Sequence, residues 1–255
     1  KSLKAAHCQN LVEKVRKKIS SWKTRLLSKA GRLELIRSIL SSYSIYWTIA
    51  FALLCSTIHA IEVLFSKFFW SGADADNSFH MISWKSICKP KEEGGLGIRR
   101  IGEWNKVCIL AQLWDLLQRR TSLWVDWAYA CYLSNTSIWV KVRRTYDSWI
   151  WKNILDCRDI LRQHIHYVVG DGSRFSLLYD PWLPSGHSIF ELTSDQIRQA
   201  LGLPHDTRLA HFIHEGHWEL PQAITIEMMD VWPVILRTPI QGNMDSICWK
   251  HNNGV

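Results

Sequence analysis

The segment from Phe68 to Asn105 carries the most specific pattern in this chain of 255 residues. Its first part ends a run of large apolar residues with Ser71-Gly72, a pair that is typical of a helix end. Its centre holds the adjacent glycines Gly94 and Gly95, which indicate a tight turn between packed layers. Helical spacing returns from Trp104 onward. In order, the pieces are FFWSG at 68–72, ISWK at 82–85, KPKEEGGLGIR at 89–99 and WN at 104–105.

The spacing of apolar residues predicts helices on both sides of this segment. Leu11, Val15 and Ile19 fall on one narrow face, which predicts an amphipathic helix with a basic outer face. Ser28 is a predicted N-cap for a second helix, whose apolar stripe runs to Leu54. We expect a third helix after residue 56, a short strand near 81–84, and further helices near 104–114, 122–132 and 148–155.

The pattern changes after residue 160. The ranges 165–169 and 174–179 flank Gly170-Asp171-Gly172, which predicts a β-hairpin. Residues 181–255 hold six of the seven prolines, which favours a loop-rich segment with short helices near 195–201 and 222–230. The fold class that we predict is therefore mainly α, with a smaller mixed α/β tail that contains a β-hairpin.

The net charge of +8 is concentrated at the N-terminal side. Residues 1–40 hold eleven Lys or Arg and two Glu, whereas residues 41–255 hold twenty Lys or Arg and twenty-one Asp or Glu. Such a block attracts polyanions, either nucleic-acid phosphate or an anionic membrane face.

Tryptophan and cysteine contents add two expectations. The fifteen tryptophans indicate core packing or, as the alternative, platforms for stacked bases. The seven cysteines are widely spaced, without a Cys-x-x-Cys pair, which favours free thiols in a reducing, intracellular compartment and no zinc site. The chain starts at Lys1 without a signal-peptide layout, and we expect it to be a fragment.

Taken in order, these motifs resemble the region that follows the palm in LINE-type (non-LTR) retrotransposon reverse transcriptases, especially those of plants. The flanking motifs agree, with LSKAGR at 27–32, LI at 35–36, VGDG at 169–172 and YDPW at 179–182. The resemblance extends from about Trp22 onward. It implies a basic, thumb-like helical region over 1–72, a Trp-rich helical region over 73–160 and a mixed α/β appendage over 161–255, ending before the zinc-binding segment of that family.

The resemblance implies a fragment of an RNA-directed DNA polymerase, located in the nucleus, that binds RNA and RNA–DNA hybrid. Its further partners would be the palm, fingers and zinc-binding segments of the parent polyprotein. The catalytic aspartates that hold Mg²⁺ in such enzymes would precede Lys1. This chain has no Asp-Asp pair, and we expect Asp74-x-Asp76 to be solvated. We therefore assign no catalytic residue and no cofactor to this fragment, although Mg²⁺ is expected in the full-length enzyme.

The basic residues of the first two helices are the predicted nucleic-acid-binding site. Lysines and arginines along exposed helix faces reach successive phosphates without reading bases. The alternative is a solvated face that keeps the protein soluble. The predicted binding residues are Lys14, Arg16, Lys17, Lys18, Lys23, Arg25, Lys29, Arg32 and Arg37.

Other interpretations of the sequence are weaker. The glycines at 94–97 are not followed by Lys-Ser/Thr, so they do not match a phosphate-binding loop. His211, His214 and His217 lack the His-Glu-x-x-His order, and we predict no metal site there. Ser38–Ile58 is free of charged residues over twenty-one positions, which leaves a membrane span as an alternative. A non-catalytic structural or interaction module from an inactive element is the remaining alternative.

Overall fold

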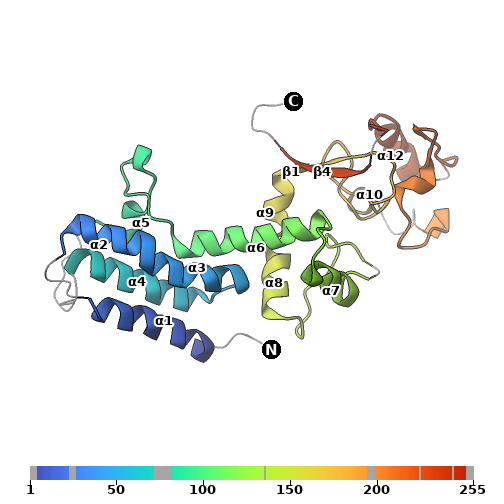
Figure 1. The fold of residues 1–255 in the computed structure, drawn as a ribbon. Helices are drawn as coiled ribbons and strands as arrows, with labels where there is room; N and C mark the ends of the chain where they lie inside the picture. The colour runs from blue at the N-terminus through green and yellow to red at the C-terminus, as the bar shows by residue number, and fades with distance from the viewer. Residues whose placement is uncertain are drawn as a thin grey trace. The chain divides into compact units, whose positions relative to one another are not determined.

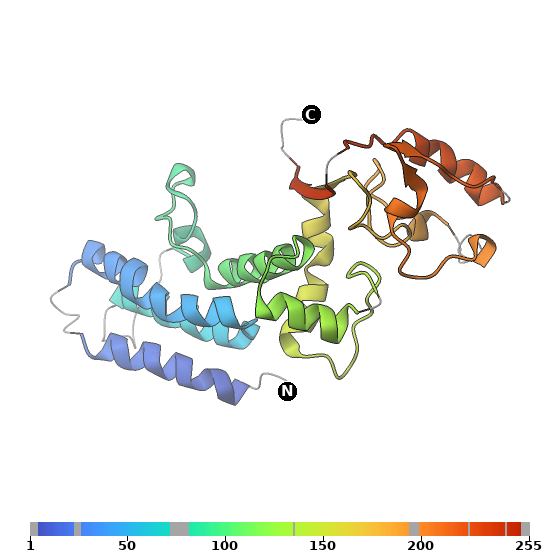
Figure 2. The same cartoon turned by 45° about the vertical axis from the view of Figure 1, so that its right-hand side comes forward.

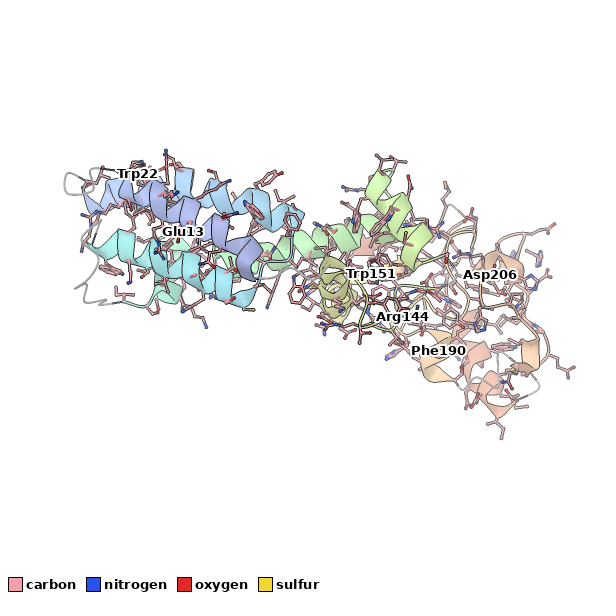
Figure 3. The ribbon with its side chains drawn as sticks, turned by 90° about the horizontal axis from the view of Figure 1, so that it is seen from below. Glu13, Trp22, Arg144, Trp151, Phe190 and Asp206 are labelled. Atoms are coloured by element: carbon pink, nitrogen blue, oxygen red, sulfur yellow. The ribbon has the colours of Figure 1, made fainter. Side chains whose placement is uncertain are left out.

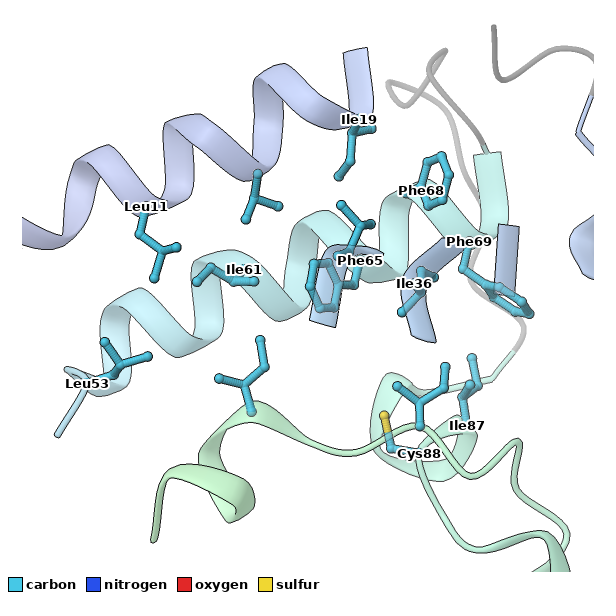
Figure 4. Packing of buried hydrophobic residues seen from close by; sticks show 14 of the residues in the cluster. Leu11, Ile19, Ile36, Leu53, Ile61, Phe65, Phe68, Phe69, Ile87 and Cys88 are labelled. Carbon is cyan, nitrogen blue, oxygen red and sulfur yellow. The ribbon is translucent and has the colours of Figure 1, made fainter. Parts of the chain in front are cut away.

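The apolar stripe of the N-terminal segment forms one side of α1 (Ala5–Ser20). This side packs on α4 (Cys55–Ser71), and the two helices lie side by side in both views (Figures 1 and 2). Figure 4 shows Leu11 and Ile19 of α1 directed toward Ile61 and Phe68 of α4. The predicted amphipathic helix is confirmed, and its buried positions follow the spacing of three and four that a helix requires.

The computed structural model describes residues 5–22, 27–71, 82–134, 136–193, 199–223, 225–242 and 244–250. The chain divides into two units, one made of residues 1–111 and 146–154, the other of residues 112–145 and 155–255. These units cut across the three sequence segments 1–72, 73–160 and 161–255, whose standing as domains stays a prediction.

The second helical segment of the first unit is continuous but irregular. Ser28 caps it, because its Oγ accepts the N–H of Gly31 at 3.2 Å, as predicted. The segment comprises α2 (Lys29–Leu35), a π-helical turn η2 (Ile36–Leu40) and α3 (Ser41–Ala50). The backbone of Phe51 is extended, so the helix ends at Ala50. The prediction that this helix continues to Leu54 is therefore wrong.

The chain between α3 and α4 is held by a buried side chain of α6 (Ile101–Leu117). Asn105 Oδ1 accepts the N–H of Leu53 at 2.8 Å, and its Nδ2 donates to the carbonyls of Thr48 at 2.9 Å and Phe51 at 2.8 Å. The range 38–58 is thus shared between two helices. Among the described residues, no helix combines the length and the apolar character needed to cross a membrane.

The segment between α4 and α6 contains short helical turns. Ser83 caps α5 (Trp84–Ile87), so the described part of the strand predicted near 81–84 is the start of a helix instead. A 3₁₀ turn, η4 (Lys91–Glu93), leads into Gly94 with φ 79°. The predicted tight turn is confirmed, and Gly95 is required there because a Cβ would meet the Lys89 carbonyl oxygen at 2.0 Å.

The second unit begins within α6 and continues with three further helices, of which those near 122–132 and 148–155 were predicted from the spacing. Ser122 Oγ accepts the N–H of Val125 and caps α7 (Leu123–Tyr132). Next come α8 (Trp149–Asp156), which both units share, and α9 (Arg158–Gln163). Arg158 then fixes the loop before α8 by donating to the carbonyls of Ile138, Trp139 and Lys141.

The predicted hairpin of 165–169 with 174–179 is wrong. Strand β1 (Ile165–Val168) pairs in antiparallel register with β4 (Ser246–Trp249), and Ile165 lies opposite Trp249. The reason is the carboxylate of Asp245, which is buried beside the turn. It accepts the backbone N–H groups of Gly170 at 2.8 Å, Gly172 at 3.0 Å and Arg174 at 2.8 Å.

The remainder of the second unit consists of short elements. Ser188 and Glu191 form a capping box at α10 (Ile189–Leu192). A two-residue turn joins β2 (Ile213–His214) to β3 (His217–Trp218), and this is the hairpin of the tail. The other elements are η5 (Leu209–Phe212) and α12 (Ile226–Leu236). The predicted class, mainly α with small antiparallel sheets, is confirmed.

Most tryptophans with a described hydrogen bond contribute to packing. Trp182 is 2% exposed and donates its ring N–H to Leu177 O, and Trp232 donates to Pro221 O. Trp149 donates to Ala52 O within the first unit. A buried indole needs one acceptor, and these carbonyls supply it. The packing explanation therefore holds for these positions.

Candidate nucleic-acid interface

Three lysines lie on one flank of α1. With Leu11, Val15 and Ile19 buried, the helical spacing directs Lys14 and Lys17 to solvent, and both are exposed. Lys18 is partly exposed and its Nζ lies 5.8 Å from the ring centre of Trp22. We call Lys14, Lys17 and Lys18 the lysine flank.

Nearby carboxylates do little to balance the positive charge of the lysine flank in the described part of the chain. Within the described residues, no carboxylate oxygen lies within 4.0 Å of the amino groups of these lysines. Glu13, labelled with Trp22 in Figure 3, instead pairs with Arg16 at 3.9 Å. That pair is exposed on both sides and contributes little stability. Lys17 and Lys18 also occupy the last turn of α1, where positive charge favours the helix dipole.

Lys29 extends the exposed positive charge to the start of α2. Its side chain is exposed, and Nζ lies 5.0 Å from the ring centre of Trp70. The contact is a cation–π interaction that leaves the hydrogen-bond donors of the amino group accessible.

Two of the predicted binding arginines are directed into the protein. Arg32 Nη1 donates to the carbonyls of Phe69 and Trp70, both at 3.4 Å, in the last turn of α4. Those carbonyls have no partner inside the helix, and Arg32 therefore acts as a C-terminal cap. Arg37 donates to Leu96 O and lies 3.8 Å from Glu34. These contacts engage the two guanidinium groups. Of the other predicted binding residues that the structure describes, Lys18 is partly exposed, and the exposed ones are Lys14, Arg16, Lys17 and Lys29.

Lys23 and Arg25 lie outside the described residues. Binding of nucleic acid by any of the nine predicted residues stays a prediction.

A cavity of about 180 Å³ lies beside Arg37 in the first unit. It is lined by side chains of α3 and of the segment around Ile98, and by Trp104 of α6. Arg99 stacks on Trp104, with 4.7 Å between the guanidinium carbon and the ring centre. This arginine–aromatic pair was not predicted, because the spacing of Arg99 and Trp104 alone does not fix the path of the chain that enters α6.

The histidines of the tail lie around the small hairpin. His211 is in η5, whereas His214 and His217 face each other across the turn of β2 and β3. In the described part of the chain, no group of three or more His, Cys, Asp or Glu residues is placed to hold a metal ion.

The chain is similar to two proteins of Arabidopsis thaliana. One, described as a putative ribonuclease H protein, is 30% identical over 190 residues, which is 73% of this chain and 30% of that protein. The other, described as an uncharacterized mitochondrial protein, is 25% identical over 119 residues, which is 46% of this chain and 77% of that protein. This chain therefore spans less than a third of the first relative's length. No protein-family model and no solved structure matches it.

Proposed function

We propose that this chain is part of a retroelement-derived protein that acts on nucleic acid, and that it holds RNA or RNA–DNA hybrid by the backbone. The similarity to a protein described as a putative ribonuclease H protein supports this context, because ribonuclease H activity concerns RNA–DNA hybrids. The concentration of positive charge in residues 1–40 supports a polyanionic partner.

The observation that carries the proposal is the lysine flank of α1. Lys14 and Lys17 are exposed, and the described carboxylates do not neutralise them. Flexible ammonium groups on a helix surface bind phosphates as point charges, without a fixed geometry that would select a base. Binding is therefore tolerant of sequence and strongly dependent on salt.

The finer identity that we propose is the thumb-like region of a LINE-type reverse transcriptase, on the strength of the motifs between Phe68 and Trp182. In that case other segments of the parent polyprotein, the palm, the fingers and the zinc-binding segment, are the partners of this chain. The palm supplies the Mg²⁺ ions and the chemical step, and this chain positions the hybrid. With this identity, the location that we propose for the chain is the nucleus.

The direct test is a titration of a fluorescently labelled RNA–DNA hybrid with the purified chain, followed by anisotropy. We expect binding at about 50 mM salt that falls by orders of magnitude at about 200 mM, because counterions are released on binding. Hybrids of unrelated sequence should bind alike. Absence of binding at the lower salt concentration would contradict the proposal and favour a structural or interaction module.

A further inference from the structure

Three arginines line a second cavity, which lies entirely within the second unit. The cavity has a volume of about 90 Å³, and Arg119, Arg174, Arg208, Asp180, Tyr129 and Tyr167 are among the residues that line it. We call it the arginine cavity. It belongs to a different unit from the lysine flank, so binding of a ligand there is independent of the proposed function.

Arg119 reaches the cavity from an unusual backbone position. It follows the last turn of α6 with φ 47°, in the left-handed region that favours glycine. The N–H of Arg119 donates to Leu116 O at 3.0 Å and that of Arg120 to Asp115 O at 3.1 Å, which closes the helix end. The guanidinium carbon of Arg119 lies 4.9 Å from the ring centre of Tyr129. Strained backbone of this kind is concentrated at functional sites.

Arg174 and Arg208 are fixed by backbone carbonyls. Arg174 Nη2 donates to Leu117 O, and Arg208 Nη1 donates to Arg174 O at 2.9 Å. A guanidinium carries five N–H donors, so these bonds orient each group and leave most of its donors available. The two side chains are only partly exposed.

The three arginines have no ionic partner in the described part of the chain. None of their nitrogens lies within 4.0 Å of a described carboxylate oxygen. Asp180 lines the cavity, but its carboxylate accepts the hydroxyl of Ser137 at 2.7 Å and the N–H of Ser176 at 2.8 Å. Burial lowers the pKa of Arg174, and the nearby charge of Arg119 acts in the same direction. The positive charge is therefore not fully compensated.

The size and the donors of the cavity favour a compact anion. A volume of about 90 Å³ leaves room for several water molecules and therefore for a tetrahedral oxyanion. Planar guanidinium groups match the oxygens of phosphate by paired hydrogen bonds. His205 and Asp206, the latter labelled in Figure 3, are exposed and also line the cavity.

We propose that the arginine cavity binds a phosphate group, either as inorganic phosphate or as the phosphate of a nucleotide. Arg119, Arg174 and Arg208 contact its oxygens.

Isothermal titration calorimetry of the full chain with inorganic phosphate, thymidine 5′-monophosphate and thymidine tests the proposal. We expect saturable binding of both phosphates and none of thymidine. Tighter binding of the monophosphate assigns the site to nucleotides, and equal or tighter binding of inorganic phosphate assigns it to the free anion. Absence of saturable binding by both phosphates, or equal binding of thymidine, overturns the proposal.

Matched substitutions locate the site. Arg119→Gln and Arg208→Gln each weaken phosphate binding by about tenfold or more, since charge-assisted hydrogen bonds are strong. Arg120→Gln is the control, because the neighbouring Arg120 is exposed, pairs with Asp115 at 3.1 Å and does not line the cavity. If Arg208→Gln fails to fold, Arg119→Gln still decides, because Arg119 is exposed. Wild-type affinity in Arg119→Gln, or an equal loss in Arg120→Gln, contradicts the proposal.

A variant of the lysine flank separates this proposal from the proposed function. Changing Lys14, Lys17 and Lys18 together to Gln should leave phosphate binding unchanged, because these residues belong to the first unit. Loss of phosphate binding in that variant would place the anion on α1 and refute the assignment to the arginine cavity.

Discussion

The substitution Asp245→Asn tests how the second unit is held together. Asp245 is 6% exposed, and its two carboxylate oxygens accept four backbone N–H groups, those of Gly170, Gly172, Arg174 and Phe175. Asparagine has nearly the same shape, but one of its terminal atoms is an NH₂ donor. That donor would face two N–H donors in the position where an acceptor is required.

The expected loss follows from these contacts. Two hydrogen bonds to a charged acceptor disappear, each contributing about 1.5–3 kcal/mol, so the free energy of unfolding falls by about 3–6 kcal/mol. The two bonds that remain also weaken, because a neutral amide replaces a carboxylate. This loss is a large fraction of the free energy of unfolding of a typical domain, which is about 5–15 kcal/mol.

Urea unfolding followed by tryptophan fluorescence measures the effect. Trp249 of β4 stacks on Trp114, with ring centres 4.8 Å apart, and therefore reports on the strand that follows Asp245. The control is Asp171→Asn in the same turn. Asp171 is exposed and accepts the N–H and the hydroxyl of the neighbouring Ser173, so we expect a change within about 1 kcal/mol. A change of that size in Asp245→Asn as well would refute the reasoning.

Two further predictions concern other polar side chains. Asn105→Ala removes the three hydrogen bonds of a buried side chain and should lower the free energy of unfolding of the first unit by about 2–4 kcal/mol, measured by urea unfolding. A loss below about 0.5 kcal/mol would contradict it. The hydrogen bonds from Arg162 hold the pKa of Glu191 at about 2. Because this value lies below the unfolded value of about 4.3, Glu191 stabilises the protein above that pH, and the contribution is lost as the pH falls toward 2. The melting temperature of Glu191→Gln should therefore lie below that of the wild type at neutral pH, and the two melting temperatures should converge near pH 2. A difference that does not change with pH would contradict this.

Local patterns made much of the helical structure predictable. Ser28 is an N-cap as predicted, and the helix predicted near 122–132 begins at a second serine cap, Ser122, because a cap depends on residues within one turn of it. The stripe of α1 likewise follows from spacing alone. The end of α3 at Ala50 was not predictable from the stripe, because Asn105, more than fifty residues away, binds the carbonyls of Thr48 and Phe51.

Long-range contacts explain the two main differences. The sequence around Gly170-Asp171-Gly172 resembles a hairpin turn, but Asp245 binds the backbone of this turn and directs β1 to β4. Similarly, Arg32 lies at a position that the sequence places among the exposed cations. Its guanidinium caps the end of α4 instead, because carbonyl groups there lack partners. Neither contact has a signal within its own stretch of sequence.

The central claim, that the lysine flank binds the phosphates of an RNA–DNA hybrid, is tested most directly by salt dependence. The slope of log K against log salt is compared between the wild type and the chain with Lys14, Lys17 and Lys18 changed to Gln. The control changes the exposed lysines Lys85, Lys91 and Lys106 of the same unit to Gln and so loses the same charge. The account predicts a slope shallower by about two to three in the first variant and nearly unchanged in the control. Equal slopes in the wild type and the lysine-flank variant would contradict it.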